Sequence, residues 1–166
     1  MAMRMAVVLD NIRSVHNVGS IFRTADALGV EEIFCCGITP GPLDRFRKVR
    51  ADFAKVALGA ERTVAWEIAG KTEEAVAHLR RDGWKVYAVE QSENSVRYYR
   101  ARPAEKIALV LGSEVGGLSE AVLGQCDAAL EIPMEGKKES LNVAVAFGIV
   151  AFDLRYRVVE LGDAAA

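Results

Sequence analysis

The segment from Ile107 to Phe152 constrains the fold more than any other part of the chain. The run at 107–111 is short, apolar at every position and followed by a glycine-rich turn, which is typical of a parallel strand buried on both faces. A second such run, at 128–132, stops at Pro133, and a helix that is apolar almost all round begins near Ser140. Because strands of this kind need helices on both sides, the segment predicts one half of an α/β sheet.

The rest of the chain repeats this alternation. Further buried strands are predicted at 6–9, 31–36 and 84–89 and a weaker one at 63–67, separated by helices at 18–28, 51–59 and 72–82 and followed by a short helix at 119–126. We expect Asn17, Thr72 and Ser119 to cap three of these helices and Gly29 to end the first. Strands alternating with helices predict a parallel α/β sheet with helices on both faces. The 166 residues contain no repeat and no linker, so one domain spanning 1–166 is expected.

Composition excludes several classes of protein. The formal net charge is −2, so a polyanion would have to bind a local patch and not the whole surface. No apolar run is long enough to cross a membrane, and the first residues lack a secretory pattern. Cys35 and Cys36 are adjacent in an apolar run, and with Cys126 they make an odd number, which favours core residues in a reducing, cytoplasmic compartment. His16 and His78 have no ligand-like spacing, so no metal site is expected.

Polar side chains stand where predicted strands end and predicted helices begin. Glu114 follows one strand, and Ser140 and Asn142 precede the last helix. In open α/β sheets this edge binds ligands, although Ser and Asn are also good caps, and spacing alone leaves both interpretations open. Arg23 lies opposite Ile21 on its helix, in line with Gly19, so it is either solvated or directed across a glycine-lined gap at an anion.

Two segments combine cations with aromatic residues. The loop 37–50 carries Phe46 among four cations, and 94–102 carries two tyrosines among three arginines. Such a mixture suits a phosphate backbone and an unstacked base, although a charged loop is more often simply solvated. The chain has no Gly-Lys-Ser/Thr phosphate loop, no dinucleotide fingerprint after its first strand and no serine elbow.

Three segments together resemble the signature of the TrmH/SpoU family of RNA ribose 2′-O-methyltransferases, part of the SPOUT superfamily. The first is 11–29, in which Asn17, Gly19 and Arg23 match an N-x-G…R-x-A pattern. The second is LVLGSEVGGL at 109–118, and the third is IPMEGKKESLNVAVA at 132–146. The three occur in order and span nearly the whole chain, which makes the resemblance specific.

The resemblance implies an S-adenosylmethionine-dependent enzyme that methylates the 2′-hydroxyl of RNA, with tRNA favoured over rRNA. It also implies a C-terminal deep trefoil knot, a homodimer formed through the helix at 141–154, and a single SPOUT domain without an N-terminal RNA-binding extension. No metal is needed. The family's cofactor contacts fall, by position, on Val89, Gly112, Ile132, Met134 and Leu141.

Catalytic roles follow from the same resemblance. Arg23 would act at the 2′-hydroxyl together with an RNA phosphate, or fix that phosphate while the proton leaves another way. Asn17 and Asn142 would position the sugar or Arg23, and Ser140 would join the same cluster. Glu114 would orient the loop and Arg23, either within the chain or across the dimer. RNA contacts are expected at Arg45, Arg47, Lys48, Arg50, Arg97 and Arg100.

Two alternatives remain beside this hypothesis. One is a non-catalytic RNA-binding or assembly factor on the same fold, which would not need the full set of catalytic residues. The other is a nucleotide-binding α/β domain that acts on a small molecule, which the missing phosphate loops disfavour.

Overall fold

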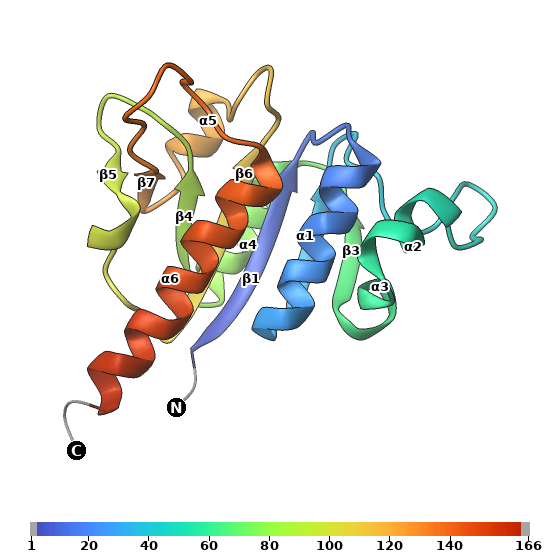
Figure 1. The fold of residues 1–166 in the computed structure, drawn as a ribbon, viewed down its shortest axis with the longest axis horizontal. Coiled ribbons are helices and arrows are strands. Elements are labelled where there is room, and N and C mark those ends of the chain that lie inside the picture. Colours follow the sequence, from blue (N-terminus) through green and yellow to red (C-terminus); the bar gives the residue numbers. More distant parts are fainter. Residues whose placement is uncertain (1–2, 164–166) are drawn as a thin grey trace.

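The computed structural model describes residues 3–163, with side chains described as far as Arg157 (Figure 1). Within these residues the strands are β1 (Arg4–Asp10), β2 (Glu32–Cys36), β3 (Ala65–Ala69), β4 (Lys85–Val89), β5 (Val96–Arg97), β6 (Lys106–Gly112) and β7 (Ala128–Glu131). They form one sheet in the order β3-β2-β1-β6-β4-β7-β5. All neighbouring strands are parallel, which confirms the predicted parallel α/β sheet.

Helices cover both faces of the sheet (Figure 1). One face packs against α1 (Val15–Leu28), α2 (Ala51–Ala57), α3 (Ala60–Thr63) and the long α6 (Val143–Asp163). The other face packs against α4 (Thr72–Arg81) and α5 (Glu120–Leu123). A short 3₁₀ helix, η1 (Tyr98–Arg100), follows β5.

The central positions of β1 and β6, residues 5–9 and 107–111, are all apolar because both faces of these strands are buried. In β6, Ile107, Leu109 and Leu111 face the core beneath α1 and α6, whereas Ala108 and Val110 face α4 and α5. The paired strand β1 repeats this pattern, with its larger residues toward α1 and α6. Both sides of each strand are therefore buried. The sequence shows no alternation of polar and apolar residues, because the side chains on both faces of the strand are apolar.

Two predicted caps are wrong, and both corrections matter for the site. Helix α1 begins at Val15 and not at Val18, because the Ser14 hydroxyl accepts a hydrogen bond from the Asn17 amide at 3.1 Å and is the true N-cap. The side chain of Asn17 is thereby left available for other contacts. Thr72 is the first residue of α4 and not its cap, and its hydroxyl donates to the carboxylate of Asp10. Ser119 does cap α5, and Gly29 ends α1 with φ +65°.

Other boundaries differ in small ways from the prediction. The helix expected at 51–59 ends at Ala57, because Leu58 and Gly59 both adopt positive φ, and a separate short helix, α3, follows at 60–63. The strand expected at 63–67 lies two residues later, as β3, and α5 ends at Leu123 and not at Cys126.

The cysteines are core residues and not reactive groups. Cys35 and Cys36 are buried in β2, and burial raises the pKa of their thiols to about 12 and about 11. Burial likewise raises the pKa of the half-buried Cys126 thiol to about 11. The thiols are therefore protonated at neutral pH and make poor nucleophiles.

Asp127, the residue before β7, connects that strand to the start of β4 through hydrogen bonds. Its carboxylate accepts hydrogen bonds from the Val86 amide at 2.8 Å and from the Lys85 ammonium at 3.0 Å. Burial opposes ionisation of this carboxyl, but those two donors outweigh it and hold its pKa below the usual value.

We expect Asp127→Asn to lower the free energy of unfolding by about 1–2 kcal/mol at pH 7, since a charged acceptor is lost from two hydrogen bonds. Because the folded-state pKa is depressed, this stabilisation is present above the unfolded pKa of about 4 and disappears as the pH falls through the folded value. Urea unfolding of both proteins between pH 7 and pH 2.5 measures this. Asp82→Asn, which removes an exposed contact with His78, is the matched control and should change little.

Candidate active site

A cavity of about 190 Å³ opens at the carboxyl edge of the sheet. Since all strands are parallel, the segments that follow β4, β6 and β7 leave the sheet at this same edge and form the cavity walls. The apolar part of the wall comes from strand ends, from the turn before α6 and from the first turns of that helix: Val89, Leu111, Leu130, Ile132, Met134, Leu141, Val143 and Ala146.

The charged groups that line the cavity are all acidic. Glu90, Glu114, Glu131 and Glu139 contribute to the wall, and none of the described residues that line it is Lys or Arg. A concave site with charges of one sign attracts ligands of the opposite sign. The cavity therefore favours a ligand that is apolar in part and positively charged in part, and disfavours a phosphate group.

Glycines allow the loop after β6 to fold back against its own strand. A Cβ atom at Gly112 would lie 2.7 Å from the carbonyl carbon of Gly117, which is closer than backbone atoms permit. Gly117 itself has φ +60°, and the Glu90 carboxylate beside it accepts a hydrogen bond from the Leu118 amide at 3.1 Å. The loop is thus fastened to the end of β4, which closes one side of the cavity.

A hydrogen-bonded cluster joins three segments that are distant in the sequence. The side-chain nitrogen Nδ2 of Asn142 donates to Asn17 Oδ1 at 3.0 Å, and Nδ2 of Asn17 donates to Glu114 Oε1 at 3.2 Å. The same Glu114 oxygen lies 3.5 Å from the Val143 amide, and Asn142 Oδ1 accepts from the Ala144 amide at 2.9 Å. Asn142 therefore caps α6 and also binds α1, while Glu114 lies at the N-terminus of α6, where a carboxylate is stabilised.

Most of the predicted site residues meet at this cavity. Glu114 and Ser140 line it, and Asn17 and Asn142 join it through Glu114. The residues expected to contact the cofactor all lie in its wall: Val89, Gly112, Ile132, Met134 and Leu141. Their functional roles stay predictions.

Arg23 does not lie at the cavity of its own chain. It is exposed in a second groove, between α1 and α2, beside His16, Ser20 and Lys55. It follows Asn17 by about one and two-thirds helical turns, so the two side chains leave α1 in different directions. The expected orientation of Arg23 by Glu114 is therefore not made within one chain, because Glu114 contacts Asn17 and Val143 instead.

The two basic segments lie at opposite edges of the sheet. The loop 37–50 follows β2 beside the edge strand β3, and Arg45, Arg47 and Lys48 are exposed on it, while Arg50 pairs with Asp52 at 3.2 Å. Arg97 and Arg100 lie exposed on β5 and η1 at the other edge, with the Arg97 guanidinium donating to the Tyr99 hydroxyl at 2.9 Å. On a single chain the two patches do not form one continuous surface.

Three acidic residues of the cavity are not among the predicted site residues. Glu90 directly follows β4 and Glu131 ends β7, so the rule that polar groups gather at the carboxyl ends of parallel strands could have found both. Glu139 lies in an irregular turn and carries no such signal. In the part of the chain that the structure describes, no cluster of three His, Cys, Asp or Glu residues could hold a metal ion, and no helix is long and apolar enough to cross a membrane.

Comparison with known proteins adds the following similarities. The sequence model of the SpoU rRNA Methylase family matches residues 4–152. The chain is 34% identical over 150 residues to a 23S rRNA (guanosine-2′-O-)-methyltransferase of Ralstonia nicotianae, covering 90% of this chain and 57% of that protein. It is 30% identical over 158 residues to a tRNA (guanosine(18)-2′-O)-methyltransferase of Thermus thermophilus, covering 95% of this chain and 77% of that protein. The crystal structure of an AdoMet-bound rRNA methyltransferase from Sinorhizobium meliloti has a TM-score of 0.84 at 28% identity, covering 95% of this chain and 58% of that chain.

We expect Gly112→Ala to destabilise the protein by about 1–3 kcal/mol, because the added methyl group meets the Gly117 backbone, which cannot move without opening the loop. Thermal unfolding measures the loss. Gly116→Ala in the same loop is the matched control, since a Cβ atom there lies 3.7 Å from Ser113 Oγ, an ordinary contact. Equal stability of the two variants would contradict the close approach.

Proposed function

The chain belongs to the SpoU rRNA Methylase family, and we propose that it transfers a methyl group from S-adenosylmethionine to a ribose 2′-hydroxyl of RNA. The observation that carries the proposal is the Asn17–Glu114–Asn142 cluster, which unites all three signature segments at the mouth of one cavity. The chain spans 57% of the length of the Ralstonia relative and 58% of the Sinorhizobium chain. Its activity, substrate and cofactor are therefore part of the proposal.

The cavity fits S-adenosylmethionine by its chemistry. The cofactor combines a flat adenine with a net positive charge, and the cavity combines apolar walls with carboxylates. Val89, Ile132, Met134 and Leu141 would enclose the adenine, while the bare backbone at Gly112 permits close approach. The enclosed space is smaller than the usual range of about 300–1,000 Å³, so the ligand extends through the open side. When bound, the cofactor supplies a methyl group activated by its sulfonium charge.

The protein's own contribution is orientation. Asn17, Glu114 and Asn142 are locked by their mutual hydrogen bonds and by the N-terminus of α6, so they form a rigid polar wall for the ribose, with Ser140 beside them. We assign Arg23 to the phosphate next to the target ribose, because a guanidinium offers several N–H donors in a planar fork and has no acceptor.

The proposed assembly is a homodimer formed through α6. Val145, Phe152 and Tyr156 are 51%, 39% and 56% exposed, and their spacing places them on one stripe of this helix. An exposed apolar stripe on an otherwise buried helix fits a second copy of the chain. Arg23 lies on α1, which packs beside α6 near Gly148 and Thr24, so it borders the same surface. We therefore place Arg23 of the partner subunit at each cavity.

The order of the strands supports the finer prediction of a trefoil knot. Strand β7 follows β6 in sequence but lies between β4 and β5. Helix α6 then returns over the sheet, and the Arg157 guanidinium donates to carbonyl groups of Tyr98, Tyr99 and Ala101, in the segment that joins β5 to β6. In the proposed topology, the chain after β7 passes through the loop formed by 90–105.

The proposed enzyme is one SPOUT domain that acts on RNA in the cytoplasm. One continuous sheet with a core on each face supports a single domain, whose outermost residues 1–2 and 164–166 lie outside the described part. Relatives act on tRNA and on 23S rRNA, and tRNA is the substrate we favour.

The primary test is transfer of radiolabelled methyl groups from S-adenosylmethionine to unmodified tRNA and rRNA, followed by digestion to nucleosides. We expect labelled 2′-O-methyl nucleosides from the wild type. Arg23→Ala should reduce transfer at least about 100-fold while cofactor affinity changes little, because Arg23 is assigned to an RNA phosphate and does not line the cofactor cavity of its own chain. Arg81→Ala, an exposed arginine on α4, is the control. Cofactor binding without label in any RNA would instead support a non-catalytic RNA-binding factor.

Mixed dimers test whether Arg23 serves the partner's cavity. Ile132→Trp should fill the cavity and abolish cofactor binding, and Arg23→Ala should remove the cation, so each variant alone is inactive. Random mixing of the two makes half of the dimers mixed, each with one complete site, so about a quarter of wild-type transfer should return. A mixture as inactive as its components would place Arg23 at the cavity of its own chain.

A further inference from the structure

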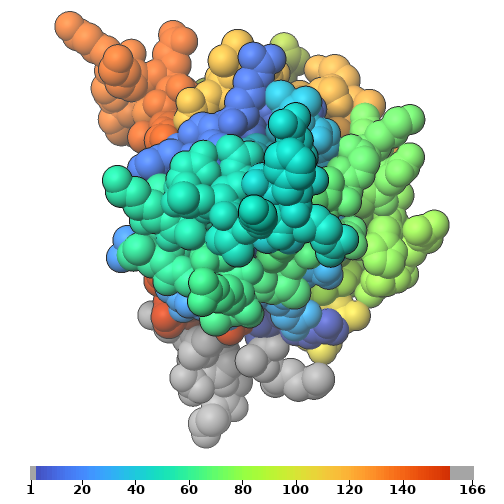
Figure 2. All heavy atoms as spheres, turned by 90° about the vertical axis from the view of Figure 1, so that its right-hand side faces the viewer, coloured from blue at the N-terminus to red at the C-terminus, as the bar shows by residue number. Residues whose placement is uncertain are grey.

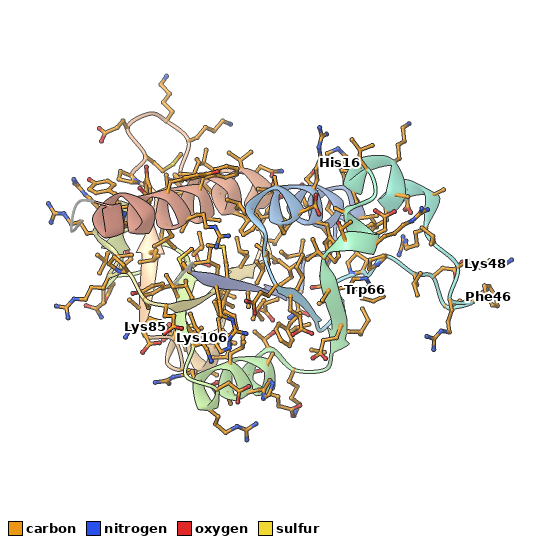
Figure 3. All side chains as sticks on the ribbon, turned by 90° about the horizontal axis from the view of Figure 1, so that it is seen from below. His16, Phe46, Lys48, Trp66, Lys85 and Lys106 are labelled. Carbon is orange, nitrogen blue, oxygen red and sulfur yellow. The ribbon has the colours of Figure 1, made fainter. Side chains whose placement is uncertain are left out.

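An exposed aromatic side chain stands at the tip of the loop 37–50, away from the proposed active site. We define the basic tip as residues 43–49, and Figure 3 shows its Phe46 and Lys48 at the far end of the loop, pointing away from the body of the molecule. Phe46 is 68% exposed, and the guanidinium of Arg45 lies 4.7 Å from the centre of its ring. Figure 2 looks onto this side of the molecule, where the loop and α2 form the surface nearest the viewer.

The basic tip is an ordered turn, not a loose loop. The Asp44 carboxylate accepts hydrogen bonds from the Phe46 amide at 2.8 Å and from the Lys48 amide at 2.9 Å, and Leu43 and Val49 pair as an antiparallel bridge. The Asp44 amide in turn donates to the Lys48 carbonyl at 2.9 Å. These contacts fix the position from which Phe46 projects, so a ligand of Phe46 would meet a preorganised surface with little ordering cost.

The charge of the basic tip identifies the chemistry of that ligand. Arg45, Arg47 and Lys48 outnumber the one carboxylate, Asp44, in a chain whose net charge is −2. A flat apolar ring flanked by cations complements an unpaired base flanked by phosphates, because the ring stacks on the base and the cations bind the phosphates. A double-stranded RNA hides its bases in the stack and would leave Phe46 in water.

The basic tip is also continuous with the groove that contains Arg23. Arg50 follows it directly and immediately precedes α2, whose Lys55 lines that groove with Arg23. Helix α2 is fixed against α1 by an edge-to-face contact between Phe22 and Phe53, with ring centres 5.0 Å apart. A polyanion held by Arg23 would therefore meet Lys55 on its way to the basic tip, and Asp52, a carboxylate that lines the same groove, is paired with Arg50 at 3.2 Å.

We propose that Phe46 is a stacking platform for an unpaired base of the substrate RNA, outside the nucleotide that is methylated, and that Arg45, Arg47 and Lys48 bind the phosphates around that base. The proposal rests on the proposed function in taking RNA as the substrate. It implies that the enzyme requires a single-stranded stretch or a loop near its target ribose.

Direct RNA binding tests the stacking. Fluorescence anisotropy would compare a labelled unstructured RNA oligonucleotide with a duplex of the same length, for the wild type, Phe46→Ala, Phe46→Leu and Phe46→Tyr. We expect Phe46→Ala and Phe46→Leu to weaken binding to the single strand about 10-fold and Phe46→Tyr to keep it, since one stacked base contributes about 1–3 kcal/mol. Duplex affinity should be unchanged. Ile68→Ala, which removes an exposed apolar side chain from β3, is the matched control.

The salt dependence separates the aromatic residue from the cations. Arg47→Gln should lower the slope of log affinity against log salt by about one, whereas Phe46→Ala should leave the slope unchanged, because stacking releases no counterions. A reduced slope in Phe46→Ala would mean that the substitution disturbs the cations of the turn, which overturns the stacking role.

Catalytic measurements distinguish failure of this inference from failure of the proposed function. If the wild type methylates RNA, Phe46→Ala should raise KM for RNA about 10-fold with kcat and cofactor affinity unchanged, as expected for a contact distant from the reaction. Unchanged KM and unchanged single-strand affinity would overturn the stacking platform alone. Full single-strand affinity in Phe46→Leu would also overturn it, since a leucine has no ring. A wild type that neither binds nor methylates RNA would overturn both proposals.

Discussion

The hydrogen bonds among Asn17, Glu114 and Asn142 are the interaction on which the site depends. They join the first turn of α1, the loop after β6 and the N-cap of α6. Two of the three residues make a further contact, because Asn142 also caps α6 and Glu114 also accepts a hydrogen bond from the Val143 amide. The cluster therefore fixes where α6 begins. Helix α6 in turn closes the cavity and carries the exposed apolar stripe that we propose packs against a second copy of the chain.

Charge divides the surface into regions with different tasks. The cavity is lined by carboxylates, which suit a sulfonium cofactor and repel phosphate, whereas the cations lie on the groove along α1 and α2 and on the basic tip. A chain with a net charge of −2 can bind a polyanion only through such separation. In the proposed function, this separation keeps the RNA phosphates out of the cavity assigned to the cofactor.

Local patterns in the sequence were enough to predict the sheet and much of the site. The apolar runs at 107–111 and 84–89 became β6 and β4, and the residues after them became the cavity wall. The caps were harder to predict, because Asn17 and Ser14 are equally good candidates by residue type, and only the path of the preceding chain decides between them. Thr72 was misassigned for a similar reason, since its hydroxyl binds Asp10, 62 residues away in the sequence.

The sequence by itself determined the parallel α/β fold and the residues that meet at its carboxyl edge, because burial on both faces and the direction of parallel strands leave little choice. Only the tertiary structure decided that Arg23 faces a different groove from Asn17, and that the two basic segments stand at opposite edges of the sheet. The order of strands depends on contacts between residues far apart in the chain. Such contacts leave no periodic signal in a single sequence.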